Sequence, residues 1–169
     1  MYFRHLLVLL ATLQLSCSAV SMRQDDILNR SRELNQKLTV LDTHLDTPSR
    51  ALNLPDWALH EKSEETLVDL PRMRAAGVNA PFMVVYTSPS LKGQDALVHA
   101  LALSDVISGW VEDYPRELSL ARAASDVPAA KRAGKISVVM CMENSSPILE
   151  GRLDLVRTFY RLGVLYMSL

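Results

Sequence analysis

Short apolar runs alternate with segments of helical periodicity over most of this chain, and this alternation restricts the folds open to it. Apolar runs rich in β-branched residues predict four strands, at residues 38–41, 78–87, 136–142 and 164–169. Helical spacing predicts the helices between them, at residues 67–76, 94–114, a stretch ending at Gly134, and 153–162. Strands that alternate with helices form parallel β/α units with right-handed connections. We therefore expect an α/β fold.

The size and charge of the chain exclude several classes of protein. Its 169 residues suit a single domain, and its 49% of hydrophobic residues is sufficient for a core. Eighteen Lys and Arg oppose nineteen Asp and Glu, so no basic excess points to a nucleic-acid partner. Two cysteines exclude a disulfide-rich scaffold and a zinc module built from cysteines.

The N-terminus has the composition of a secretory signal peptide. Arg4 and His5 precede an apolar stretch that is too short to span a bilayer, and small residues lead to Ala19. A buried N-terminal helix is the alternative. A signal peptide predicts a product of the secretory pathway that is secreted, periplasmic or membrane-associated and extracellular.

The chain accordingly divides into three predicted segments. Residues 1–19 form the signal peptide, residues 20–37 a polar helical extension, and residues 38–169 the β/α domain. Within the extension, apolar residues are few, and a helix is expected over residues 25–38.

Ionisable side chains follow two of the predicted strands. Asp42, His44 and Asp46 are spaced by two, so an extended strand would point them to one side. His44 and Asp46 offer an imidazole nitrogen and a carboxylate oxygen, which suit zinc, and Glu143 is a third candidate ligand. The carboxyl ends of parallel strands meet at one edge of a sheet, where sites in such folds lie. The alternatives are a surface turn for His44 and Asp46, and a buried structural thiol for Cys141, which shares the parity of Glu143.

Three blocks of sequence form a recognisable set. They are Leu41–Pro48 (LDTHLDTP), Asp69–Val78 (DLPRMRAAGV), and Glu143-Asn144 with the later segment Phe159–Leu169 (FYRLGVLYMSL). In this order they resemble the membrane (renal) dipeptidases, the zinc peptidases of family M19. The resemblance spans nearly the whole chain that follows the signal peptide.

The resemblance implies a fold, an activity and a set of ligands. The fold is the N-terminal half of an amidohydrolase-type TIM barrel, with about four β/α units over residues 38–169. The activity is zinc-dependent hydrolysis of dipeptides in the complete protein, whose site holds two zinc ions; this chain would hold at most one, weakly. His44 and Asp46 correspond to ligands of one zinc, and Glu143 to the carboxylate that bridges both. No further catalytic residue is expected in this half, and membrane anchoring would belong to the full-length protein.

The chain also departs from the family pattern. Leu45 stands where the family often has asparagine, and Ser145-Ser146-Pro147 stand where it has glycine-containing residues. The family's active-site histidines and its proton-handling aspartate come from positions after Leu169. We therefore expect this chain to be a truncated, inactive portion, and a poorly soluble one because its first and fourth strands would lie at open edges.

Three other functions remain open. The chain could be a non-catalytic secreted product that binds a partner. Two copies could instead pair their open edges in a homodimer. An amidohydrolase-type enzyme that acts on a different amide is the third, and the blocks at residues 69–78 and 159–169 disfavour it.

Overall fold

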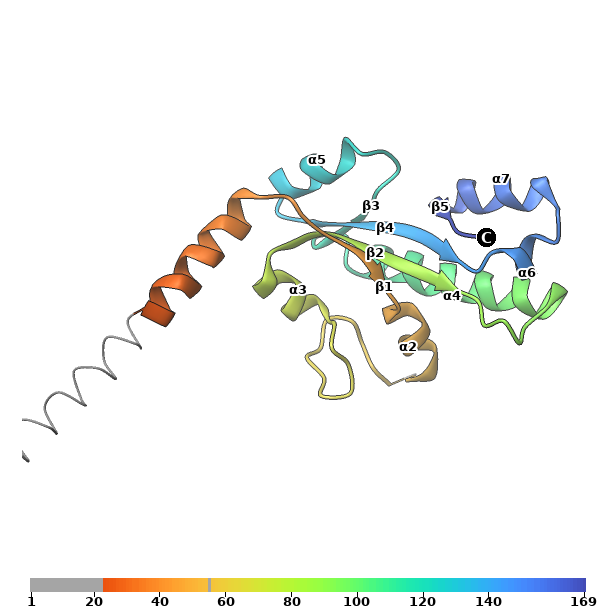
Figure 1. Cartoon of the computed structure of the whole chain (residues 1–169), viewed down its shortest axis with the longest axis horizontal. Helices are drawn as coiled ribbons and strands as arrows, with labels where there is room; N and C mark the ends of the chain where they lie inside the picture. Colours follow the sequence, from red (N-terminus) through yellow and green to blue (C-terminus); the bar gives the residue numbers. More distant parts are fainter. Residues whose placement is uncertain (1–22, 55) are drawn as a thin grey trace, which may run out of the picture. The chain divides into compact units, whose positions relative to one another are not determined.

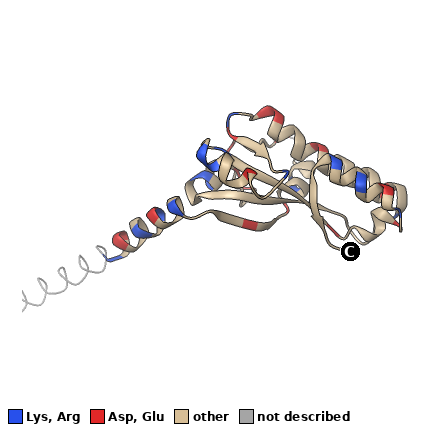
Figure 2. Ribbon diagram, turned by 90° about the horizontal axis from the view of Figure 1, so that it is seen from above, with Lys and Arg blue, Asp and Glu red and all other residues tan. Residues whose placement is uncertain are grey.

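The fold is described from a computed structural model, which describes residues 23–54 and 56–169. The predicted signal peptide, residues 1–19, lies outside the described residues. The chain divides into two compact units, residues 1–38 and 39–169. In the first unit, residues 23–37 form a helix, as the sequence predicts, and acidic and basic side chains alternate along it (Figure 2).

The second unit is built on one parallel sheet of five strands (Figure 1). The strands are β1 (Val40–Leu45), β2 (Val78–Tyr86), β3 (Leu118–Leu120), β4 (Ile136–Glu143) and β5 (Val164–Met167). Their order is β1-β2-β4-β3, and β5 also pairs with β4. β3 pairs with the first half of β4 and β5 with its second half. Among the described strands, β1 pairs with β2 alone, so β1 and β5 both lie at edges.

Helices connect these strands and cover the sheet. They are α2 (Thr47–Asn53), α3 (Leu70–Ala76), α4 (Gly93–Asp113), α5 (Asp126–Arg132), α6 (Ser146–Leu149) and α7 (Leu153–Leu162). In Figure 1, α2, α3 and α4 lie on one side of the sheet and α5 on the other. Parallel strands joined by helices are the α/β fold that the sequence predicts.

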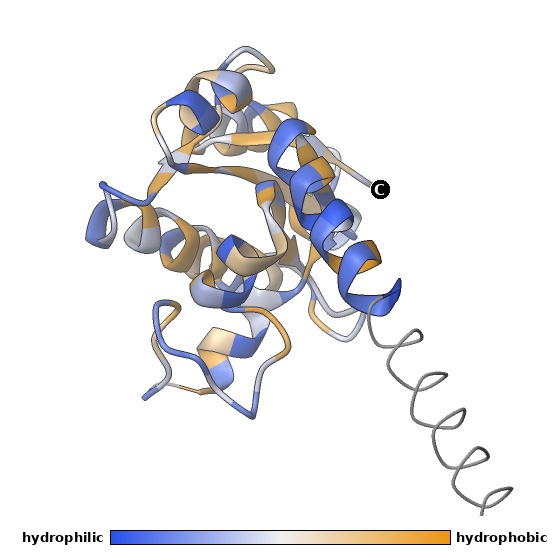
Figure 3. Cartoon of the chain, turned by 90° about the vertical axis from the view of Figure 1, so that its left-hand side faces the viewer, coloured by the Kyte–Doolittle hydropathy of each residue, from blue (hydrophilic) through white to orange (hydrophobic). Residues whose placement is uncertain are grey.

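The core follows from the alternation of side chains along β2 and β4. One face of these strands packs against α4: Met83, Val85, Val138, Met140 and Met142 contact a cluster that includes Leu103 and Ile107. The other face is smaller, and there Ala80 and Val139 pack with Val127 of α5. Burial on both faces explains why these strands are continuously apolar, and Figure 3 shows the strands largely in the orange of hydrophobic residues.

Three short elements were not expected from the sequence. One is α2: a proline often ends a strand, but Pro48 lies in the first turn of this helix, where its missing N–H costs no hydrogen bond. β3 and α6 have three and four residues, too few to show a hydrophobic period. The first strand is also longer than predicted and extends to Leu45.

The block DLPRMRAAGV builds α3 and delivers the chain to β2. Asp69 is fully buried, and its carboxylate accepts hydrogen bonds from the backbone N–H of Arg72 (2.8 Å) and from the Arg72 guanidinium (2.5 Å). The same guanidinium donates to the carbonyl oxygens of Ser63 and Thr66. At the other end, Gly77 closes the helix with φ of 73°, as predicted. These bonds fasten the start of α3 to the loop that precedes it.

Among the described helices, none is both long and apolar enough to cross a bilayer, although α4 has 21 residues.

Candidate metal site

The three predicted ligands converge at one edge of the sheet. His44 lies near the end of β1, Asp46 directly follows that strand, and Glu143 is the last residue of β4. β1 and β4 both pair with β2 in parallel, so their carboxyl ends lie at the same edge. Segments separated by about a hundred residues in the sequence thus contribute to one cluster.

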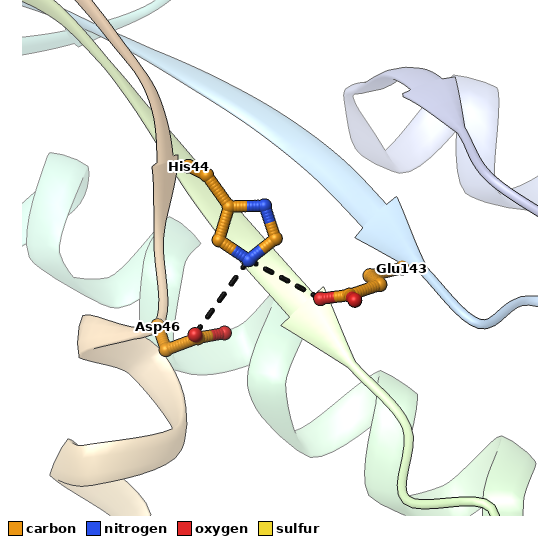
Figure 4. Close-up of side chains that lie close together, drawn as sticks. All are labelled: His44, Asp46 and Glu143. Atoms are coloured by element: carbon orange, nitrogen blue, oxygen red, sulfur yellow. Dashed lines mark ion pairs between the residues drawn. The ribbon is translucent and has the colours of Figure 1, made fainter.

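Within this cluster the imidazole of His44 lies between two carboxylates (Figure 4). Its Nε2 is 3.2 Å from a carboxylate oxygen of Glu143 and 3.6 Å from one of Asp46. One ligand atom from each residue lies within 4.8 Å of the others. The side chains are 47%, 41% and 59% exposed for His44, Glu143 and Asp46, so an ion from solvent can reach them.

The chemistry of this donor set suits a divalent cation. One neutral imidazole and two carboxylates supply nitrogen and oxygen donors, the ligands that zinc takes besides thiolates. The two negative charges would balance a dication and would otherwise repel each other. The residues present therefore fit the metal that the sequence resemblance implies.

Asp42 and Asp46 do not behave as strand alternation predicted. Asp42 lies outside the cluster, and its carboxylate accepts a hydrogen bond from the backbone N–H of His44 at 3.2 Å. Asp46 is beyond the end of β1, with φ of −81° and ψ of 17° just before α2. The turn from strand to helix, rather than the two-residue spacing, therefore brings Asp46 beside His44.

Cys141 is a buried thiol near the site and not a member of it. Its side chain is 1% exposed, and its sulfur donates to the carbonyl oxygen of Met83 at 3.5 Å. Burial raises the pKa of this thiol to about 11, and the nearby Asp46 and Glu143 add to that shift, while a hydrogen bond with Tyr166 opposes it. The buried structural thiol considered from the sequence is confirmed.

A cavity of about 350 Å³ adjoins the two ligands from β1 and its C-terminal turn. It is lined by His44 and Asp46 together with Leu45, Thr47, Arg50, Glu65, Thr66, Leu67 and Val68. Arg50 on α2 donates to the carbonyl oxygen of Glu65 at 3.2 Å, and Leu67 is 93% exposed. The sequence did not identify this cavity, because its lining comes from α2 and from a loop without periodicity.

Residues 28–169 match the family model described as membrane dipeptidase (peptidase family M19). Over 160 residues, the chain is 27% identical to dipeptidase ataJ of Aspergillus terreus. The aligned region covers 88% of this chain and 39% of that protein.

Two solved structures share the fold. Dipeptidase AC, a metallo peptidase of family M19, has a TM-score of 0.68 at 24% identity, over 78% of this chain and 42% of that one. A metallo peptidase from Rhodobacter sphaeroides, liganded with a phosphinate mimic of the dipeptide L-Ala-D-Ala, has a TM-score of 0.66 at 22% identity, over 77% of this chain and 44% of that one. The chain thus spans about two fifths of the length of these relatives. Its α/β unit has the fold of part of an amidohydrolase-type TIM barrel, which confirms the predicted fold class.

Proposed function

Because the chain belongs to the membrane dipeptidase family, peptidase family M19, we propose that it supplies His44, Asp46 and Glu143 as part of the ligand set of a zinc centre that hydrolyses dipeptides, and that the 169-residue chain is inactive by itself. The observation that carries this proposal is the convergence of the three side chains from two strand ends, with their ligand atoms within 4.8 Å. Zinc bound there would polarise the scissile carbonyl and activate water.

Each ligand has a distinct part in holding the ion. Nε2 of His44 lies between the two carboxylates, so this nitrogen is the metal-ligand atom at the centre of the cluster. Asp46 contributes one oxygen from the β1 side of the cluster. Glu143 turns one carboxylate oxygen to His44, which leaves its other oxygen available to a second ion. That arrangement supports the bridging role that the family resemblance implies for Glu143.

The cavity beside the ligands supports a dipeptide as the substrate. Its volume of about 350 Å³ accommodates a small peptide group, and it combines apolar Leu45 and Leu67 with the cation of Arg50. A small side chain of a dipeptide could pack against the two leucines, and its terminal carboxylate could pair with the Arg50 guanidinium. The dipeptide mimic bound by the Rhodobacter sphaeroides relative supports the same substrate class.

The proposal is tested by measuring zinc affinity in matched variants of the full chain. Asp46→Asn removes a negative charge from the cluster. Asp42→Asn is the control: it removes a negative charge outside the cluster, and its amide oxygen can still accept the hydrogen bond from the backbone N–H of His44. We expect Asp46→Asn to weaken zinc binding by about tenfold or more and Asp42→Asn to change it little. Competition with a chromophoric chelator measures both. Equal losses in the two variants would show that general charge, not the cluster, attracts the metal.

A second candidate function, self-association as a non-catalytic product, is favoured by one observation. An apolar cavity of about 380 Å³, lined by Leu41, Phe82, Val139 and Leu165 among others, lies on the face of the sheet opposite α4. Its lining includes residues of β1 and β5, the two edge strands. Edges of this kind pair with other chains. Gel filtration with light scattering would give a dimer mass if this candidate is right and a monomer mass if it is wrong.

The cellular location rests on residues 1–19. Their composition supports secretion, to the periplasm, the extracellular space or the outer side of a membrane. Amino-terminal sequencing of the native protein tests this proposal: a mature chain that begins after Ala19 supports it, and an intact Met1 contradicts it.

A further inference from the structure

Asn144, the residue after Glu143, has an unusual backbone conformation. Its φ is 55°, and within the described residues Glu150 is the other non-glycine residue with positive φ. Asparagine tolerates this left-handed region better than most residues, and alanine does not. Backbone of this kind persists where the surrounding structure holds it, often beside a functional site.

The surroundings do hold it, through the ends of two other strands. The side-chain amide of Asn144 donates to the carbonyl oxygen of Thr87 at 2.6 Å, and the backbone N–H of Thr87 donates to the carbonyl oxygen of Glu143 at 3.3 Å. Thr87 is fully buried and directly follows β2. These two reciprocal bonds fasten the end of β4 to the end of β2.

The end of β5 is fastened to the same turn. Ser168 donates its backbone N–H to the carbonyl oxygen of Met142 at 2.9 Å. Its carbonyl oxygen accepts hydrogen bonds from the backbone N–H (3.0 Å) and the hydroxyl (2.6 Å) of Ser145, which is fully buried. The residues on both sides of Glu143 are therefore bound to neighbouring strands.

The Glu143 side chain has far less support of its own. It is 41% exposed, and its one ion pair among the described residues is with His44. Its direction must then come from the backbone that carries it. A change of φ at Asn144 would rotate the chain after Glu143 and break the bonds to Thr87 and Ser168.

We propose that Asn144 is a positioning residue for the metal site. Its left-handed backbone and the hydrogen bond from its side chain to Thr87 hold the end of β4 so that the Glu143 carboxylate faces His44. This inference rests on the proposed metal site. It assigns to Asn144 a role in metal affinity, with no direct contact to the metal.

Two variants of Asn144 separate the effect of the backbone conformation from the effect of the side-chain hydrogen bond to Thr87. Asn144→Ala loses both the tolerance for positive φ and the bond to Thr87, whereas Asn144→Gly loses only the bond. We expect zinc affinity to fall by about 10- to 100-fold in Asn144→Ala, the range found when groups that orient metal ligands are removed, and by less in Asn144→Gly.

Asn79→Ala is the matched control. The Asn79 side chain accepts a hydrogen bond from the backbone N–H of Val40 at 2.9 Å, so it also joins two strands, but at the opposite end of β1 and β2. This variant should lower the melting temperature without changing zinc affinity, because its bond is far from the ligands. Comparing the two sites distinguishes positioning from general stabilisation.

Hydrogen exchange of the Thr87 amide gives a readout without metal. Exchange should quicken more in Asn144→Ala than in an equally destabilised Asn79→Ala, because the Thr87 N–H bonds to the Glu143 carbonyl. Wild-type zinc affinity together with wild-type exchange in Asn144→Ala would overturn the inference while leaving the metal site intact. A wild-type chain that binds no zinc would overturn the metal site and this inference with it.

Discussion

The three candidate ligands reach the site by different local routes. His44 is placed by a strand, Asp46 by the turn that leads into α2, and Glu143 by the last position of a buried strand. The residue types and their positions near strand ends were visible in the sequence. The turn that carries Asp46 was not visible, because a proline such as Pro48 can end a strand as well as begin a helix.

At the same scale, two glycines lead to opposite predictions. Gly163 has φ of 122°, and a Cβ there would lie 2.9 Å from Leu120, whereas a Cβ at Gly109 in α4 would meet nothing within 4 Å. Gly163→Ala should lower the free energy of unfolding by about 2 kcal/mol. Gly109→Ala should raise it by up to about 1 kcal/mol, because alanine favours the helix. Urea denaturation measures both, and a loss of stability in Gly109→Ala equal to that in Gly163→Ala would contradict the argument.

Among the elements, α3 is fastened at its start by a buried ion pair. Asp69 and Arg72 form a pair in which the carboxylate is fully buried and the guanidinium is 30% exposed. Asp154 and Arg152 form a pair at a similar distance, 2.6 Å, but on the surface, where the two side chains are 54% and 61% exposed. Burial and the added hydrogen bonds of Arg72 make the first pair the stronger contribution to stability.

Replacement of each acid by alanine tests this difference. Asp69→Ala removes the helix cap and leaves the Arg72 guanidinium without its carboxylate, which should lower the free energy of unfolding by about 3 kcal/mol. Asp154→Ala removes an exposed pair and should lower the free energy of unfolding far less, because solvent screens the two charges. Thermal and urea unfolding give both values. An equal loss of stability in Asp154→Ala and Asp69→Ala would contradict the larger contribution to stability that is assigned to the buried pair.

The longer elements were predictable and the short ones were not. The buried strands β2 and β4 are long enough for their continuous apolar character to identify them, and Gly77 and Gly163 mark the ends of α3 and α7. β3 and α6 are fixed by their neighbours and not by their own sequence: β3 by pairing with β4, and α6 by packing against α4. Tertiary contacts of this kind leave no periodic signal in a short segment.

The support of Glu143 was equally invisible in the sequence. The bonds that join Asn144 to Thr87 and Ser145 to Ser168 connect residues 57 and 23 positions apart. No local spacing could have brought these residues together. The ligand types were therefore predictable, while the contacts that orient them required the fold.

For the whole molecule, the number of ligands limits what the chain can do alone. The described residues contain one group of three side chains that could hold a metal. The 169-residue chain should therefore bind one zinc ion and show no measurable dipeptide hydrolysis, because the resemblance to the family implies a centre of two ions. Assays of the zinc-loaded chain with Ala-D-Ala, by release of free alanine, check this expectation. Turnover abolished by Glu143→Gln would contradict it and would make the chain an enzyme by itself.

The most direct test of the account is the position of zinc in crystals of the full chain, by anomalous diffraction at the zinc edge. The proposed metal site predicts one peak at about 2 Å from Nε2 of His44, within reach of the Asp46 and Glu143 carboxylates. A peak at other side chains, or none at this edge of the sheet in zinc-soaked crystals, would contradict the proposed metal site.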